Sequence, residues 1–192
     1  MKQKERKNKP VRHVDLSQYS RGSYDPGHLS KRVGWYVVNA LFVDTKIPWP
    51  QKLKKWLLIF FGARIGTDFV IKPRVSVKYP WFLEAGEHVW IGEGVWIDNL
   101  SPIKIGNHVC ISQGTAIFTG NHDYKKTSFD LIVKPVEIHD GVWVGAKCVI
   151  CPGVILGTHS VITAGSVVTN DTETYFVYQG NPARSVRGRE LK

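Results

Sequence analysis

The stretch Ile138–Glu173 reads, in groups of six residues, IHDGVW, VGAKCV, ICPGVI, LGTHSV, ITAGSV and VTNDTE. Every group begins with an aliphatic residue, and the fifth residue of every group is Val, Cys, Ser or Thr. A period of six fits neither an amphipathic helix nor the two-residue alternation of a long strand. It is typical of a coil of short strands, each of which sends one large aliphatic side chain into a narrow core. We therefore predict an all-β solenoid of hexapeptide repeats.

The same period extends toward the N-terminus, with interruptions. It begins at Ile65, shifts by two residues before Ile91 and again before Ile105, and then stops. Residues 119–136 have no usable period, and the repeats resume after them. Because this insertion separates two regular coils, we expect it to project outward as a loop. Loops on a rigid scaffold are frequent sites of function.

Charge is distributed unevenly along the chain. Residues 1–64 carry 14 Lys and Arg and 4 Asp and Glu, whereas residues 65–192 carry 12 of each kind. The formal net charge of +10 therefore lies wholly ahead of the repeats. Such a basic arm could favour nucleic acid or an anionic membrane surface, or it could simply aid solubility. Of these partners, we expect no nucleic acid.

Two short helices are predicted within this basic region, over residues 28–43 and 51–61, because apolar residues recur there at helical spacing. Neither apolar run approaches the ~20 residues that a membrane span requires, and no secretory signal is evident. The helices either cap the open end of the solenoid or rest on a bilayer surface. We expect a cytoplasmic protein, with membrane association left open.

The predicted organisation has three parts. Residues 1–64 form a basic arm and helical cap, residues 65–175 form the solenoid with its inserted loop 119–136, and residues 176–192 form a C-terminal segment. Cys148 and Cys151 make a CxxC pair, but both occupy small-residue positions of their hexads. We interpret them as packing residues rather than as a redox or metal site.

One histidine stands apart from the other six as a candidate general base. An alcohol oxygen is a poor nucleophile until a base removes its proton, and neutral imidazole is the usual base near pH 7. His122 opens the inserted loop between Asn121 and Asp123, whereas four other histidines lie within the coils. Either Asp123 or a backbone carbonyl could orient its ring.

Two tryptophans are predicted to face outward from the solenoid. Side chains alternate along a strand, so the residue before an inward aliphatic position points away from the core. Trp143 precedes Val144, and Trp96 precedes Ile97. A large exposed ring usually has a ligand or a neighbouring subunit to cover it.

Several motifs together resemble the hexapeptide-repeat O-acetyltransferases, which include maltose and galactoside acetyltransferases. The loop start GNHDY (120–124) and the ending GNPAR (180–184) are similar to that group. A closer resemblance is to the colanic-acid-biosynthesis type, through VDLS (14–17), KYPW (78–81), WIGEGVWIDNL (90–100) and GVWVGA (141–146). The resemblance covers nearly all of residues 14–187.

The resemblance implies a left-handed parallel β-helix with three hexads per turn, and a homotrimer that binds acetyl-CoA between subunits. It implies acetyl transfer to a sugar hydroxyl in extracellular or surface polysaccharide biosynthesis, with no metal. The acceptor would be a sugar, a sugar nucleotide or a lipid-linked glycan.

The resemblance also assigns roles to individual positions. His122 is the general base, and the acceptor side includes Asp98, Asp123 and Trp143. The residues placed along the coenzyme are Gly145, Ala146, Ala164, Thr169, Arg184 and Arg187. This chain has Asn170 where the family often has a basic residue, which weakens the case for a phosphate contact there.

Three alternatives remain at this point. The acceptor could be another small hydroxylated molecule, or the chain could be a non-catalytic hexapeptide scaffold. A hydratase resembling the γ-class carbonic anhydrases would need a metal-binding histidine five residues before His122. Ile117 occupies that position, which argues against the hydratase.

Overall fold

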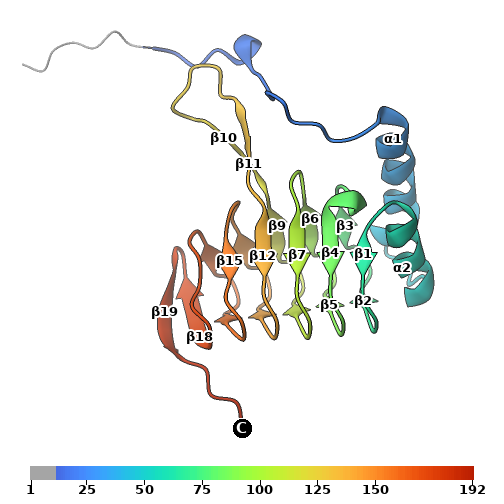
Figure 1. Ribbon diagram of the computed structural model, residues 1–192, viewed down its shortest axis with the longest axis vertical. Coiled ribbons are helices and arrows are strands. Elements are labelled where there is room, and N and C mark those ends of the chain that lie inside the picture. The colour runs from blue at the N-terminus through green and yellow to red at the C-terminus, as the bar shows by residue number, and fades with distance from the viewer. Residues whose placement is uncertain (1–11) are drawn as a thin grey trace, which may run out of the picture. The chain divides into compact units, whose positions relative to one another are not determined.

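The computed structural model describes residues 12–192 and shows a solenoid of short parallel strands (Figure 1). Five turns each contribute one strand to each of three sheets, which we call faces A, B and C. Face A contains β1 (Arg64–Ile65), β4 (Leu83–Ala85), β7 (Ile103–Ile105), β12 (Val136–Ile138) and β15 (Ile155–Leu156). Face C contains β3 (Ser76–Val77), β6 (Trp96–Asp98), β9 (Ala116–Phe118), β14 (Val149–Ile150) and β17 (Val167–Val168).

Face B is longer than the other two faces because a hairpin extends it. It contains β2 (Val70–Ile71), β5 (Trp90–Ile91), β8 (Cys110–Ile111), β13 (Trp143–Val144), β16 (Val161–Ile162), β18 (Phe176–Gly180) and β19 (Ala183–Gly188). β19 pairs antiparallel with β18, whereas β18 continues the parallel ladder from β16. The hairpin therefore covers the last turn of face B.

The core is a single column of aliphatic side chains inside the three faces. In the five turns, the aliphatic residue that ends or nearly ends each strand points inward, and all of these residues except the partly buried Ile65 are almost fully buried. On face B these inward residues are Ile71, Ile91, Ile111, Val144 and Ile162. The aliphatic first position of each hexad is thus the core position, as the period predicts.

The turns differ in length, and this explains the shifts in the repeat. Trp90 pairs with Cys110, 20 residues later, whereas Trp143 pairs with Val161, 18 residues later. Inward positions are eight residues apart between Val77 and Ala85, where the chain passes from face C to face A. The two extra residues of the early turns therefore lie at the corner between faces C and A. The insertion lies at this corner too.

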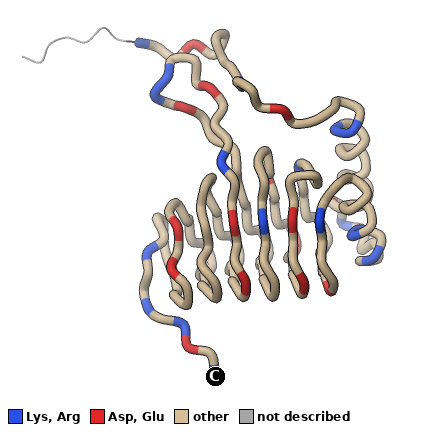
Figure 2. Tube along the Cα trace, viewed as in Figure 1, with Lys and Arg blue, Asp and Glu red and all other residues tan. Residues whose placement is uncertain are grey.

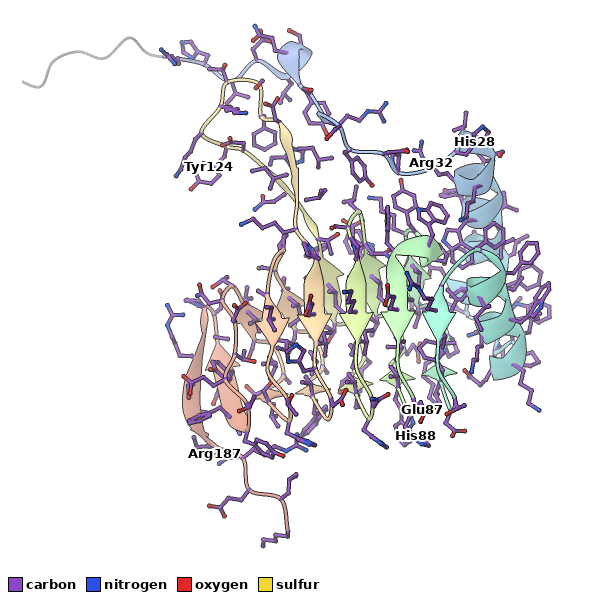
Figure 3. All side chains as sticks on the ribbon, in the orientation of Figure 1. His28, Arg32, Glu87, His88, Tyr124 and Arg187 are labelled. Carbon is purple, nitrogen blue, oxygen red and sulfur yellow. The ribbon has the colours of Figure 1, made fainter. Side chains whose placement is uncertain are left out.

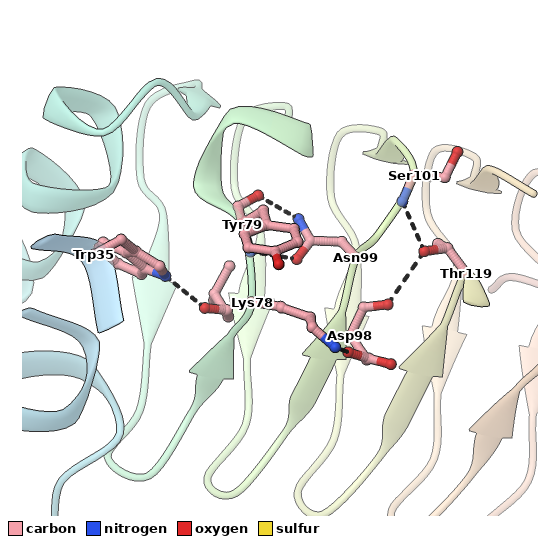
Figure 4. A network of polar contacts seen from close by, with 8 residues as sticks. Trp35, Lys78, Tyr79, Asp98, Asn99, Ser101 and Thr119 are labelled. Carbon is pink, nitrogen blue, oxygen red and sulfur yellow. Dashed lines mark hydrogen bonds and ion pairs between the residues drawn. The ribbon is translucent and has the colours of Figure 1, made fainter. Parts of the chain in front are cut away.

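Side chains hold this corner together where the extra residues interrupt the backbone ladder (Figure 4). The fully buried Asn99 accepts a hydrogen bond from the Tyr79 N–H at 2.9 Å and donates one to the Tyr79 carbonyl at 2.6 Å. Thr119, also fully buried, accepts from the Ser101 N–H at 2.9 Å and donates to the Asp98 carbonyl at 3.2 Å. These bonds replace the ladder and give the insertion a fixed base.

Helices cover the open edge of the first turn, at the opposite end from the hairpin (Figure 1). They are α1 (Leu29–Val38), a π-helical turn η2 (Asn39–Val43) and α2 (Gln51–Phe60). Trp35 donates its indole N–H to the Val77 carbonyl at 2.7 Å, and Gln51 accepts the Ile71 N–H at 2.8 Å. The fully buried Lys54 donates to the Lys72 carbonyl, and burial lowers the pKa of its ammonium group. The edge groups are thus paired, as a cap requires.

Two further 3₁₀ turns occur, η1 (Leu16–Gln18) and η3 (Pro80–Phe82). The insertion itself contains β10 (Gly120–His122) and β11 (Leu131–Val133), which pair as a two-stranded sheet. The sequence predicted only a loop there, because the segment lacks the period of the coils. No helix within residues 12–192 is long and apolar enough to cross a bilayer.

The chain divides into two compact units. One combines the described arm, residues 12–24, with residues 122–132 of the insertion, and we call it the arm–loop unit. The other contains residues 25–121 and 133–192, which include the cap, the solenoid and the hairpin. Residues 1–11 of the predicted basic tail lie outside the described residues.

Candidate active site

His122 lies at the end of β10 within the arm–loop unit, and its ring is held on two sides. Phe129 stacks on it with ring centroids 4.4 Å apart and an interplanar angle of 9°. Tyr19 of the arm packs against it at 5.9 Å and 54°. Nδ1 lies 3.1 Å from the Phe129 carbonyl oxygen. A carbonyl only accepts, so Nδ1 carries the proton in this bond and the lone pair of the neutral ring is on Nε2.

Backbone hydrogen bonds fix the loop that carries this histidine. Asp123 N–H donates to the Asp130 carbonyl at 2.8 Å, and Tyr124 N–H donates to the His122 carbonyl at 3.0 Å. The Asp123 carboxylate accepts the Lys125 N–H at 3.2 Å. Of the two ways considered for orienting the imidazole, a backbone carbonyl therefore has direct geometric support. The carbonyl belongs to Phe129, and no sequence pattern pointed to that residue.

The histidines within the coils occupy different environments. His88, His108 and His159 all adopt φ of 55°, which marks left-handed corner positions that His tolerates better than most residues. The rings of His88 and His108 stack at 4.8 Å, and His88 lies on the turn before β5 (Figure 3). His139 lies 3.7 Å from Glu137 on the outside of face A. These are corner and surface positions of the repeat.

Asp98 ends β6 at the corner between faces C and A. Its carboxylate lies 2.8 Å from the Lys78 ammonium group, and its side chain is 15% exposed (Figure 4). A groove of about 520 Å³ opens beside this pair, between α1 and face C. Tyr36 and Trp96, both exposed, line the groove, as does Arg32, whose buried Nε has no hydrogen-bond partner among residues 12–192. The arrangement offers aromatic faces and charged hydrogen-bonding groups to a polar ring.

Trp143 lies on face B with its ring outward and 49% exposed, while Val144 points into the core. Its indole N–H donates to the Ser112 hydroxyl at 3.0 Å, which fixes the ring against the preceding turn. Trp96 is similarly outward on face C and meets Phe118 edge-to-face at 5.1 Å. The strand alternation thus placed both rings correctly.

Three of the residues expected along the coenzyme come together at the corner between faces B and C. Gly145 and Ala146 follow β13, and Ala164 occupies the matching position one turn later. A Cβ on Gly145 would lie 2.6 Å from the Ala164 nitrogen, so the backbones approach too closely for a side chain. Gly145 and Lys147 N–H groups join the ladder, but within residues 12–192 the Ala146 N–H has no acceptor.

The remaining coenzyme candidates lie after β17 and on β19. Thr169 follows β17 at the far end of face C, next to Asn170, whose amide donates to its hydroxyl at 3.2 Å. Arg184 and Arg187 lie on β19 of the hairpin, and Arg187 is exposed there (Figure 3). The structure therefore gathers Gly145, Ala146 and Ala164 at this corner. The hairpin ends beside them, because the Gly180 N–H donates to the Ser166 hydroxyl at 3.1 Å and Arg184 pairs with the neighbouring Gln179.

The three cysteines lie within the coils of the solenoid. Cys148 is buried, Cys110 and Cys151 are partly buried, and burial raises the pKa of all three thiols. Such thiols stay protonated near neutral pH and pack as small apolar groups. Among residues 12–192, no three His, Cys, Asp or Glu side chains are placed to hold a metal ion.

Comparisons with known proteins agree with this architecture. The bacterial transferase hexapeptide (six repeats) model matches residues 135–170. A protein of Escherichia coli K12 that carries the name colanic acid biosynthesis acetyltransferase WcaF is 36% identical over 180 residues, or 91% of this chain and 97% of its own length. The galactoside O-acetyltransferase of the same organism is 31% identical over 129 residues, or 65% of this chain and 63% of its own.

A solved structure shows the same fold. The hexapeptide-repeat acetyltransferase of Vibrio cholerae in complex with acetyl coenzyme A superposes with a TM-score of 0.76 at 27% identity, over 84% of this chain and 88% of that one. The predicted left-handed parallel β-helix is thereby confirmed. On these likenesses, the chain belongs to the hexapeptide-repeat acetyltransferases and is an acyltransferase.

Proposed function

We propose that this protein transfers the acetyl group of acetyl-CoA to a hydroxyl of a sugar during the biosynthesis of an extracellular or surface polysaccharide. The observation that carries the proposal is the His122 ring, stacked on Phe129 and bonded through Nδ1 to the Phe129 carbonyl. This arrangement selects the tautomer that can accept a proton at Nε2. The names of the colanic acid and galactoside relatives favour a sugar as acceptor.

The proposed reaction is a direct transfer. His122 Nε2 removes the proton of the sugar hydroxyl as its oxygen attacks the thioester carbonyl carbon. The carbonyl oxygen becomes an oxyanion, and the Ala146 N–H donates to it. The carbon–sulfur bond then breaks, and His122 returns its proton to the thiolate. The products are the acetylated sugar and CoA, and the imidazole is neutral again.

The acetyl-CoA site is proposed at the corner of faces B and C. The Ala146 N–H is free of the ladder, so it can serve the thioester, and Gly145 keeps that surface open. Ala164, one turn later, would line the pantetheine arm. Thr169 is proposed near the nucleotide, and Arg184 and Arg187 near the phosphates. The acetyl-CoA complex of the Vibrio cholerae protein supports a coenzyme site on this fold.

The acceptor side is proposed around Asp98, with Asp123 and Trp143 contributing. A carboxylate such as Asp98 accepts hydrogen bonds from sugar hydroxyls, and an aromatic ring packs against the apolar face of a sugar. The groove beside Asp98 presents Tyr36 and Trp96 in this way, with Arg32 as a further donor. The sequence predicted only that the Trp96 ring faces outward, and it did not point to Arg32 or Tyr36.

A homotrimer with sites between subunits is supported by the contrast among the three faces. Face A carries Arg64, Glu84, Lys104 and Glu137 outward in alternating charge, visible in Figure 2, and Arg64 pairs with Glu84 at 3.1 Å. The outward residues of faces B and C are mainly apolar; they include Val70, Trp90, Trp143, Trp96, Ala116 and Val149. Two apolar faces suit a threefold assembly in which face B of one copy meets face C of the next.

Peripheral membrane contact through the basic N-terminal region is a further part of the proposal. α2 exposes Trp56, Ile59 and Phe60 beside Lys52, a pairing of apolar and cationic side chains that suits an anionic bilayer surface. A Phe60→Ser variant should sediment less with anionic vesicles than the parent chain. Equal sedimentation of the two chains would contradict the proposed membrane contact but would not affect the proposed transfer reaction.

The decisive experiment replaces His122 with Ala in the full chain and measures acetyl transfer to a panel of sugars and of non-sugar alcohols. Loss of a general base should reduce kcat by about 10²- to 10⁴-fold while CoA binding, measured by calorimetry, is retained. His139→Ala is the matched control, because His139 is also a partly exposed histidine. Near-normal turnover by His122→Ala would exclude the assignment. Activity on non-sugar alcohols alone would show that the acceptor is not a sugar. The absence of turnover by the parent chain would favour a non-catalytic hexapeptide scaffold.

A further inference from the structure

A pocket of about 380 Å³ lies within the arm–loop unit. One wall is the arm, with Arg12, His13 and Val14, and the other wall is the loop, residues 124–128. Tyr124, which is 74% exposed, lies on the loop wall (Figure 3). This pocket belongs to the same unit as His122 but is not used by the transfer mechanism above.

The two walls are joined by hydrogen bonds that fix the pocket. Asp15 N–H donates to the Thr127 carbonyl at 2.8 Å, and Leu131 N–H donates to the Ser20 carbonyl at 3.0 Å. The Asp130 carboxylate accepts the Ser20 N–H at 3.3 Å. The arm therefore lies along the loop as an added segment, and the cations of both walls are brought to one cavity.

Among the residues that the structure describes, the lining of this pocket is cationic and contains no carboxylate. It contains Arg12, Lys125 and Lys126 as well as His13, and neither Asp nor Glu. Lys126 is engaged by Asp130 at 3.2 Å. Within residues 12–192, Arg12 and Lys125 form no ion pair, and Lys125 lies 6.0 Å from the centre of the Tyr124 ring. Hydroxyls of Thr127 and Ser128 complete a lining suited to an anion.

We infer that this pocket binds a phosphate or diphosphate ester of the acceptor, which is therefore a glycosyl phosphate rather than a free sugar. Two cations that form no ion pair within residues 12–192 match the charge of a diphosphate, and a guanidinium group binds two phosphate oxygens at once. The pocket is tied to the base through the loop, since Tyr124 N–H donates to the His122 carbonyl. The inference rests on the proposed function, because it names the acceptor class of that same reaction.

The test compares Arg12→Gln, Lys125→Gln and the double variant of the full chain with the parent. Arg21→Gln is the matched control, since it removes one cation from the same arm but does not line the pocket. Acceptors are a nucleotide diphosphosugar, a short polyprenyl diphosphosugar and the methyl glycoside of the same sugar. Each single variant should raise the KM for diphosphate acceptors about fivefold, and the double variant about twentyfold, with kcat nearly unchanged. The KM values for the methyl glycoside and for acetyl-CoA should stay constant.

Calorimetry with inorganic pyrophosphate provides a second readout that does not depend on turnover. Binding should weaken in the pocket variants, but not in Arg21→Gln, and should weaken further as salt is raised. A preference between the two diphosphate acceptors would identify the carrier. Pocket variants indistinguishable from Arg21→Gln, or a rise in the KM for acetyl-CoA instead, would overturn the inference. If no acceptor is acetylated but pyrophosphate still binds through Arg12 and Lys125, the proposed function fails and the anion site stands.

Discussion

The solenoid and the arm–loop unit are built on opposite principles. In the solenoid, each turn repeats the same parallel ladder and the same inward aliphatic position, so every contact has near-copies above and below it. In the arm–loop unit, single contacts such as Ser20 with Asp130 and Phe129 with His122 have no copy. The comparison teaches that the repeated part supplies rigidity, while the unrepeated part supplies side-chain contacts that occur once and position particular groups such as His122.

The largest expected effect comes from placing a charge in the repeated core. Ile150 is fully buried on face C, and Ile150→Asp would bury a carboxylate with no partner. The free energy of unfolding should fall by about 5 kcal/mol or more, which urea denaturation of the purified chain would measure. Tyr124→Asp, at an exposed loop position, should leave the denaturation midpoint unchanged. Similar losses for both variants would contradict the contrast between the two regions.

A smaller loss is expected at the corner where side chains replace the ladder. Asn99→Ala removes two hydrogen bonds and leaves the Tyr79 N–H and carbonyl without them. Unfolding should be easier by about 2–4 kcal/mol in thermal or chemical denaturation. Ser101→Ala is the control, since only its backbone N–H is used there. A neutral Asn99→Ala variant would show that water takes over these bonds.

An effect on activity without an effect on stability is expected in the arm. Tyr19→Ala removes the ring that packs against His122, so kcat should fall about tenfold through poorer positioning of the base. Tyr19→Phe keeps the ring and should restore most of the activity, while the unfolding midpoint stays constant in both. A loss in Tyr19→Phe equal to that in Tyr19→Ala would assign the role to the hydroxyl instead.

The smallest effect concerns pH. The Ser128 hydroxyl first, and then Lys126, lower the pKa of Asp130 below its usual 3.8. Because the folded pKa is the lower one, this carboxylate stabilises the arm–loop contact above its usual pKa, and the contribution is lost as pH falls below about 4. Hydrogen exchange at Leu131 N–H should accelerate in that window. Asp130→Asn should exchange faster at pH 7 and show a weaker acid dependence; an unchanged profile would contradict the link.

The repeated part of the molecule could be predicted from the sequence because its physical cause is local and periodic. Each inward Ile or Val could be identified from its position in the hexad. The alternation of side chains along a strand predicted that Trp143 and Trp96 face outward. The histidine on the insertion stood out because it broke that period. The Phe129 carbonyl and the Tyr19 ring could not be found this way. Phe129 lies in a segment without a motif, and Tyr19 contacts His122 from a distant part of the chain. The groove residues Arg32 and Tyr36 lie within the predicted helix 28–43, and helical spacing alone does not indicate a groove.

The corner braced by Asn99 and Thr119 has a consequence for engineering. Elsewhere a longer turn would shift neighbouring turns out of register. This corner already holds two extra residues in successive turns, and the Asn99 amide and Thr119 hydroxyl groups bond to them. It is therefore the natural grafting point on the scaffold. Foreign peptides inserted at this corner, outside the packed turn of Pro80 and Trp81, should be displayed while the turns on either side keep their alignment.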